Sequence, residues 1–152
     1  REAVDLVELV ENVVAAHSLP ARAKLMHTEL TLQARRCLAE PALLISVMDN
    51  LYSNAVHYGA ESGNIRIHSY RHGDQVRIDV ANSGEPIPAA EKNMIFGPFY
   101  QGSHQRKGAV KGSGLGLSIA RDCVRQMQGE LSLVDAPAGQ VCFRITLPSA
   151  PE

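Results

Sequence analysis

The stretch "NLYSNAVHYG" (residues 50–59) places two asparagines, Asn50 and Asn54, four residues apart in what reads as a core helix. Asparagine is a poor residue for a helix interior, because its amide competes for backbone hydrogen bonds. The two amides lie about 40° apart with His57 beside them, since a helix turns by roughly 100° per residue. They adjoin an apolar stripe of Leu44, Met48, Leu51, Ala55 and Tyr58. This polar face is either a solvated helix flank or a set of hard amide oxygens suited to Mg²⁺.

The whole chain has the composition of one globular domain. Its 152 residues carry 15 Lys plus Arg against 16 Asp plus Glu, a formal net charge of −1 that argues against sequence-independent nucleic-acid binding. The three cysteines, Cys37, Cys123 and Cys142, have no CxxC spacing and favour a reducing compartment. No apolar run is long enough to span a bilayer. The first residues read as the middle of a helix, so we expect a fragment of a longer protein.

Hydrophobic periodicity predicts an α+β fold. We expect helices from about residue 4 into the twenties, from Pro41 onward, over 88–96 and over 114–127, with Gly129 as the last helix stop. Pro20 would bend the first helix or start a new turn. Strands are expected over 29–34, 64–70, 75–82, 130–135 and 141–147, with "RHGD" as a hairpin loop. This order predicts a mostly antiparallel sheet with helices on one face.

The stretch "KGSGLGLSIARD" (residues 111–122) resembles no common nucleotide fingerprint. Gly112, Gly114 and Gly116 alternate ahead of a helix, so backbone N–H groups and the helix N-terminus can bind an anion beside Lys111. A dinucleotide motif would need glycine where Leu117 stands, and no strand leads into the loop. A Walker A loop would end in GK[ST]. The pattern therefore predicts a phosphate-binding loop of another kind.

Two further stretches lie between these. In "VANSGEPIP" (residues 80–88) a strand ends at Asn82, whose amide can accept a hydrogen bond from an adenine amino group, although the stretch is equally an ordinary turn. In "IFGPFYQG" (residues 95–102) Phe96 and Phe99 flank a Gly-Pro turn. Aromatic residues there more often pack the base of a loop than contact a ligand.

In this order the segments resemble the four boxes of sensor histidine kinase catalytic domains, which share an ATPase superfamily with gyrase and the heat-shock chaperones. "NLYSNA" resembles the N box, "NSGEPIP" the first glycine box, "FGPFYQG" the F box and "GSGLGL" the second glycine box. The resemblance covers nearly the whole chain and implies that residues 1–152 form one domain. It implies a two-layer α/β sandwich of the Bergerat type, with about three helices on one sheet face and a flexible ATP lid. The end of the chain is also similar to the QseE/GlrK-like subgroup.

The resemblance implies ATP and Mg²⁺ as cofactors. Asn54 would be the magnesium ligand with Asn50 in support, Asn82 would face the adenine and Tyr58 would line the base pocket. Residues 97–111 would form the lid, in which Lys111, Lys107 or Arg106 are candidate phosphate contacts. The full implied set of ATP-binding residues is Asn50, Asn54, His57, Tyr58, Asn82, Gly84, Ile87, Phe96, Phe99, Lys111, Gly112, Ser113, Gly114, Leu115, Gly116 and Leu117.

Four positions depart from the family pattern. Asn82 replaces the usual aspartate and Pro86 the second glycine of its box, while His57 and Gln101 replace a common lysine and arginine. Because an amide can donate as well as accept, we expect a weaker preference for adenine over guanine. Fewer cations near the phosphates imply modest affinity, or an activity that improves at lower pH if His57 is protonated.

In this family phosphate passes from ATP to a histidine on a separate dimerisation helix and then to an aspartate of a response regulator. None of the six histidines lies in a motif like HExxTP, so the nucleophile is expected outside this chain. The implied protein is the cytoplasmic domain of an inner-membrane sensor kinase, with no nucleic-acid or direct membrane contact. The alternative is a regulatory nucleotide-binding module without transfer, either a degenerate kinase or an anti-sigma-type binder. A gyrase-like ATPase is disfavoured, because Asn50 stands where those enzymes place a glutamate.

Overall fold

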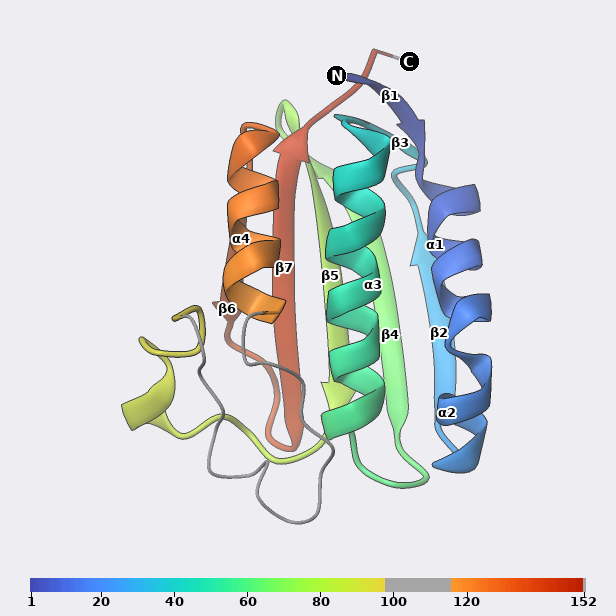
Figure 1. The fold of residues 1–152 in the computed structure, drawn as a ribbon, viewed down its shortest axis with the longest axis vertical. Helices are drawn as coiled ribbons and strands as arrows, with labels where there is room; N and C mark the ends of the chain where they lie inside the picture. Colours follow the sequence, from blue (N-terminus) through green and yellow to red (C-terminus); the bar gives the residue numbers. More distant parts are fainter. Residues whose placement is uncertain (98–115, 152) are drawn as a thin grey trace.

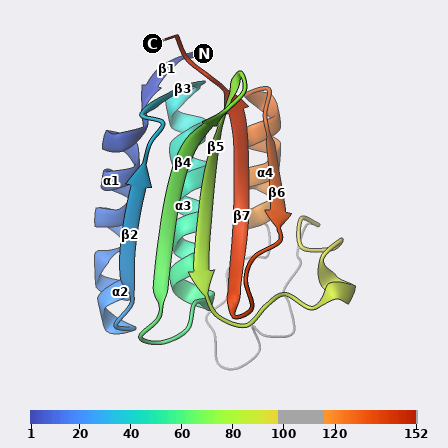
Figure 2. The same cartoon turned by 180° about the vertical axis from the view of Figure 1, so that it is seen from behind.

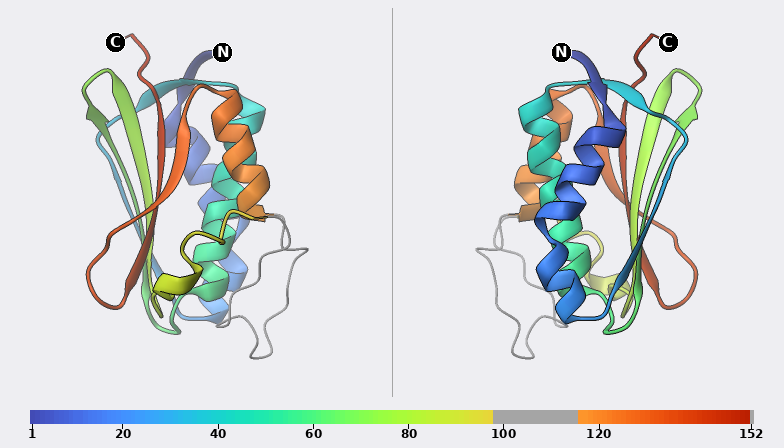
Figure 3. Two further views of the ribbon diagram at one scale, coloured as in Figure 1. Left: turned by 90° about the vertical axis from the view of Figure 1, so that its left-hand side faces the viewer. Right: turned by 90° about the vertical axis from the view of Figure 1, so that its right-hand side faces the viewer.

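The computed structural model describes residues 1–97 and 116–151. It has two layers, a five-stranded sheet and a set of helices that covers one of its faces (Figure 1), as the side views show (Figure 3). The strand order is β2-β4-β5-β7-β6, with bounds β2 His27–Leu32, β4 Asn64–His72, β5 Gln75–Ser83, β6 Glu130–Val134 and β7 Gln140–Pro148. The helices are α1 Leu6–Ala16, α2 Ser18–Ala23, α3 Pro41–Tyr58 and α4 Gly116–Gln126. Within these residues the opposite sheet face is uncovered (Figure 2).

The pairing confirms the predicted α+β class and the mixed, mostly antiparallel sheet. Among the described strands only β2 and β4 pair in parallel, and the other pairs of this sheet are antiparallel. A second, two-stranded sheet joins β1 (Glu2–Asp5) to β3 (Arg36–Ala39) at one end of the molecule. Both chain termini lie at this end, and the carboxyl end of β5 lies at the other (Figure 1).

The core fills the space between sheet and helices. The inward residues of the β4–β5 hairpin are at most 2% exposed, namely Ile65, Ile67, Val76, Ile78 and Val80. The predicted α3 stripe is buried against them at Leu44, Met48, Leu51 and Ala55. Tyr58, the last member of that stripe, is only half-buried because it lies in the final turn of the helix. Tyr52 is buried instead, with its hydroxyl 2.7 Å from Thr28 Oγ1.

The prediction of one helix from residue 4 into the twenties was wrong in two respects. Val4 belongs to β1, where it pairs with Cys37, and α1 begins only after the N-cap Asp5, which accepts a hydrogen bond from Glu8 N at 3.1 Å. The helix then breaks at His17, and α2 starts at the next residue. Pro20 lies in the first turn of α2, where its missing N–H costs no hydrogen bond, so it starts a new helix.

Several boundaries also differ from prediction. The strand expected over 29–34 runs from His27 to Leu32, and the four-residue β3 was not predicted. The helix expected over 88–96 is only the 3₁₀ turn η1 (Ala89–Glu91) followed by turns. The stop of α4 is made by Gln128, whose φ of 68° is left-handed, and not by Gly129. Gly129 is required for a different reason, since a Cβ there would overlap Thr146 O of β7.

The three cysteines are buried and free. Burial raises the pKa of the Cys37 thiol to about 12 and that of Cys142 to about 11, so both stay protonated at neutral pH. Among the described helices, none is both long and apolar enough to cross a bilayer.

Candidate functional site

Asn50 lies on the side of α3 that faces α4. Its Oδ1 is buried and accepts no hydrogen bond from the part of the chain that the structure describes. A buried acceptor without a partner costs free energy comparable with a lost hydrogen bond, so native structures seldom retain one without a reason. This amide therefore fits a site whose partner is a bound group.

The first turn of α4 packs directly against this amide. A Cβ added to Gly116 would overlap Asn50 Nδ2, so a larger residue at this position would force the Asn50 amide to move. Helix N-termini carry partial positive charge and attract anions, and α4 directs such a terminus toward Asn50. Gly116 and Leu117 lie in this turn and are half-buried.

The rest of the predicted glycine loop cannot be placed with it. Lys111, Gly112, Ser113, Gly114 and Leu115 lie outside the described residues, as do Phe99 and Gln101. The predicted ATP lid over 97–111 falls in the same region, apart from Gly97.

The last turn of α3 holds the next group of predicted site residues. Asn54 follows Asn50 by one turn, and His57 and Tyr58 end the helix, all three half-buried. The rings of His57 and Tyr58 meet edge to face with centroids 4.4 Å apart. Burial raises the pKa of the Tyr58 phenol, so the ring is neutral and suited to an apolar pocket wall.

Asn82 is the penultimate residue of β5 and lies beside this helix terminus. It is 8% exposed, and its Nδ2 donates to Ser83 O at 3.0 Å. Ser83 O also accepts from Ala60 N at 2.8 Å, which ties the segment after α3 to the end of the strand. Because the donor half of the Asn82 amide is engaged, its Oδ1 is the half left to act as acceptor, as an adenine amino group would require.

The remaining predicted residues border this region. Gly84 N donates to Gly139 O at 2.9 Å, which closes the turn after β5, and Ile87 packs against the core. Phe96 also packs against the core and meets the ring of Phe143 edge to face.

Arg121 is a site neighbour that the sequence did not reveal. Its guanidinium lies 4.1 Å from the centre of the Phe96 ring, and its Nε is 3.4 Å from Glu130 Oε1. The contact joins residues on either side of 98–115, which lie outside the described residues. No local sequence pattern could predict this Arg121–Phe96 contact, because an arginine on the polar face of a helix is common.

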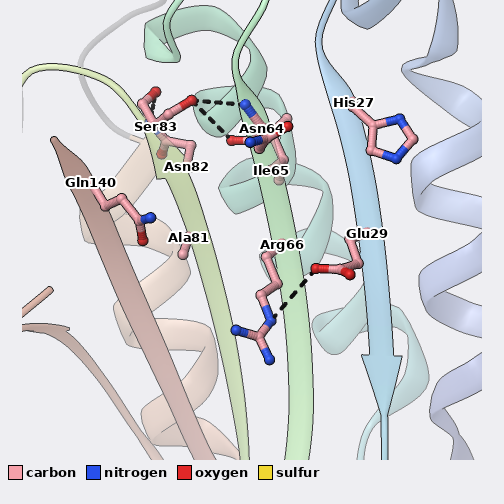
Figure 4. A pocket seen from close by; sticks show the side chains of 9 residues that line it. All are labelled: His27, Glu29, Asn64, Ile65, Arg66, Ala81, Asn82, Ser83 and Gln140. Carbon is pink, nitrogen blue, oxygen red and sulfur yellow. Dashed lines mark hydrogen bonds and ion pairs between the residues drawn. The ribbon is translucent and has the colours of Figure 1, made fainter. Parts of the chain in front are cut away.

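A separate pocket of about 400 Å³ lies on the uncovered face of the sheet (Figure 4). Its lining is mostly polar, with Arg66 and Glu29 4.0 Å apart on neighbouring strands. Asn50, Asn54 and His57 do not line it. The pocket is therefore distinct from the α3–α4 region, although Asn82 and Ser83 contribute to its wall.

Residues 39–151 match the family described as histidine kinase-, DNA gyrase B-, and HSP90-like ATPase. The chain belongs to this ATPase family. It is 71% identical over 149 residues to the sensor histidine kinase GlrK of Escherichia coli K12, an alignment that covers 98% of this chain and 31% of GlrK.

Solved structures agree with this membership. The catalytic domain of the histidine kinase ThkA matches with a TM-score of 0.82 and 28% identity, covering 99% of this chain and 98% of that one. The same kinase, solved in complex with the response regulator TrrA, matches with a TM-score of 0.80 and 27% identity over 99% of this chain and 42% of that one. These findings confirm the predicted fold and the resemblance to the GlrK-like subgroup, so the ATPase domain is of the histidine kinase catalytic type.

The residues of this ATPase domain suit Mg²⁺ on the structural observations alone. Asn50 offers a buried amide oxygen without a partner in the described part, and Asn54 offers a second amide one turn later. Neutral amide oxygens are hard donors that complement a cation already bound to phosphate oxygens and water.

Proposed function

We propose that this ATPase domain binds ATP·Mg²⁺ between α3, the N-terminus of α4 and the end of β5, and donates the γ-phosphate to a histidine of a longer sensor kinase. The observation that carries the proposal is the buried Oδ1 of Asn50, which has no partner among residues 1–97 and 116–151 and lies beside Gly116 in the first turn of α4. Family membership supplies the nucleotide class.

Each part of the site has a distinct proposed task. Asn54 holds the magnesium ion, with Asn50 beside it, and His57 stands where a phosphate contact is expected. Asn82 accepts from the adenine amino group, while Tyr58 and Ile87 form the wall of the base pocket. Gly84 shapes the turn next to the base. The glycine run with Lys111 encloses the phosphates, and Phe96 and Phe99 support the lid.

The protein contributes positioning and electrostatic stabilisation to the transfer. The γ-phosphoryl group passes through a loose transition state, so the protein has little bond-making to do. The bound magnesium ion supplies charge neutralisation at the phosphates. The N-terminal N–H groups of α4 add fixed partial positive charge there, which costs no reorganisation during transfer.

The nucleophile and the wider assembly belong to the proposal as well. We infer that residues 1–152 form one catalytic domain, with dimerisation and sensor parts elsewhere in an inner-membrane kinase and a response regulator as the final acceptor. The chain spans 31% of the length of GlrK, which leaves room for such parts in a protein of that kind. The histidine on the dimerisation domain would be the direct phosphate acceptor.

A regulatory module that binds nucleotide without transfer is the second candidate. The observation in its favour is the replacement of usual site residues at Asn82, Pro86, His57 and Gln101. Both candidates bind nucleotide, so they are separated by transfer and not by affinity.

Calorimetric titration of ATP into the chain, with and without Mg²⁺, tests the proposal. We expect binding that requires Mg²⁺ and that weakens at least about tenfold in Asn54→Ala, since a metal-ligand contact is lost. Ser53→Ala is the matched control, because its hydroxyl donates to Asn50 O within the helix. An ATP affinity that is the same with and without Mg²⁺, and the same in Asn54→Ala, would show that no metal ion binds at this position. Absence of binding in the unaltered chain would refute the function itself.

A further inference from the structure

Lys24, at the end of α2, reaches across to the C-terminus of α3. Its Nζ donates to Val56 O at 2.7 Å, to His57 O at 2.9 Å and to Gly59 O at 2.6 Å. An ammonium group has three N–H donors and no acceptor. All three ammonium N–H groups of Lys24 therefore donate to backbone carbonyls at this helix end, which leaves none to donate to a ligand.

The acceptors are those that a helix terminus leaves unsatisfied. The last four carbonyl groups of a helix have no intrahelical donor and together carry partial negative charge. In α3, Gly59 N satisfies Ala55 O at 3.0 Å, and Lys24 satisfies the carbonyls of Val56 and His57. The ammonium both completes these hydrogen bonds and offsets the negative end of the helix.

The backbone around Lys24 is fixed in the same arrangement. Lys24 O accepts from Ser62 N at 2.8 Å, so main chain and side chain both bind the segment that follows α3. Leu25 has a φ of 56°, a left-handed conformation that non-glycine residues adopt only where the surroundings impose it. Met26 N then returns to Ala21 O at 3.0 Å and closes the turn.

Burial of the ammonium is consistent with this role. Desolvation lowers the pKa of Lys24 below its usual value, and the nearby Glu61 opposes that shift. A lysine that served only as a solvated surface charge would keep its ammonium in water.

This cap adjoins both parts of the proposed nucleotide site. The turn that it holds contains His57 and Tyr58 and follows Asn54 directly. From the same segment Ala60 N donates to Ser83 O, the acceptor that also orients the Asn82 amide. A shift of this segment would therefore move the proposed metal ligand and the proposed adenine acceptor together.

We propose that Lys24 is a positioning residue for the nucleotide site, which sets the last turn of α3 and the end of β5 by capping three backbone carbonyls. The inference rests on the proposed ATP binding. It adds a residue outside the four boxes, which touches neither nucleotide nor metal and acts through the backbone that carries their ligands.

Lys24→Met tests the role, because it keeps the apolar stem and removes the ammonium. We expect the affinity for ATP·Mg²⁺ to weaken about tenfold in calorimetry at a temperature where the variant is folded. Lys24→Arg should recover part of the loss, since a planar guanidinium retains the charge but cannot match three converging acceptors equally well.

The control separates positioning from general destabilisation. Val4→Ala removes buried volume from β1, at the opposite end of the molecule, and should lower the melting temperature while leaving the affinity unchanged. Equal affinity in Lys24→Met and the unaltered chain would overturn the inference. An affinity loss in Val4→Ala as large as in Lys24→Met would overturn it too.

A second measurement does not depend on nucleotide. The side-chain amide NMR signals of Asn54 and Asn82 in the ligand-free protein should shift in Lys24→Met and stay in place in Val4→Ala. Unchanged signals in Lys24→Met would reject the positioning role even if the unaltered chain failed to bind ATP. Lys24→Gln, which lacks the charge but keeps two donors, takes the place of Lys24→Met if the latter does not fold.

Discussion

At the scale of single residues, the proposed site contains two amides whose nitrogen and oxygen atoms have different surroundings. Asn82 uses its Nδ2 on Ser83 O, and Asn50 keeps a buried Oδ1 without a partner in the described residues. The sequence-based expectation that the Asn82 amide could donate as well as accept is opposed by the hydrogen bond from its Nδ2 to Ser83 O, which favours one orientation of the amide. The amide nevertheless carries no charge, so its acceptor strength is below that of the usual aspartate.

Asn82→Asp should therefore raise the preference for ATP over GTP, by about tenfold if one hydrogen bond becomes charge-assisted. It should also lower the melting temperature, because a carboxylate would face Ser83 O in place of a donor. Competition binding with both nucleotides measures the ratio. The same ATP-to-GTP ratio in both proteins would show that Asn82 does not contact the base.

At the scale of elements, what periodicity could predict follows from how each element is buried. The long, one-sided helix α3 and the alternating β4–β5 hairpin were predictable, because burial on one face imposes a regular period. β1 was not predictable from periodicity, since Val4 continues the apolar spacing of α1. The Asp5-x-x-Glu8 capping pattern was the signal in the sequence that the helix starts later. The Lys24 cap and the Arg121–Phe96 contact join residues remote in sequence, so no local pattern predicts them.

The junction of α4 and β6 should give a measurable pH dependence. Arg125 donates to Glu130 at 3.1 and 3.2 Å, and this hydrogen bond is the main cause that holds the pKa of Glu130 below its usual 4.5. Because the pKa is lower in the folded state, the stabilisation is present above the unfolded value and is lost as pH falls through the folded value. Both side chains reach solvent, so the effect is small and salt-sensitive.

Chemical denaturation of the chain and of Glu130→Gln, at about pH 5 and about pH 3, measures this contribution. We expect the variant to lose less stability between the two conditions. Glu29→Gln is the control, since Glu29 lies 4.0 Å from Arg66 and has a more exposed side chain. A loss of equal size in Glu130→Gln and the unaltered chain would assign the acid sensitivity to other groups.

At the scale of the whole molecule, the order of the motifs was enough to predict family and fold, because four motifs in one fixed order are far more specific than any one of them. The geometry at the phosphate end was not predictable in the same way. It depends on the close packing of Gly116 on Asn50, which is a property of two helices and not of either sequence. The second glycine box beyond Gly116 and Leu117 lies outside the described residues.

Phosphate transfer to a separately supplied dimerisation domain decides between kinase and regulatory module. We expect radiolabelled phosphate from ATP to appear on that domain in an acid-labile, base-stable form, as a phosphohistidine would be. Asn54→Ala should reduce the rate at least about a hundredfold, since both nucleotide affinity and phosphate alignment depend on the metal. Binding of ATP without any transfer would favour the regulatory module.

The two ends of the chain lie at the same end of the molecule as β1 and β3, and an antiparallel bridge joins Cys37 to Ser149 (Figure 1). A pulling force on either end of the chain would therefore act first on the same backbone pairing, that of β3 with β1 and with Ser149. The last turn of α3 and the end of β5 lie at the opposite end of the molecule. The backbone pairing next to the chain ends and the proposed nucleotide site are therefore separated by the length of the sheet.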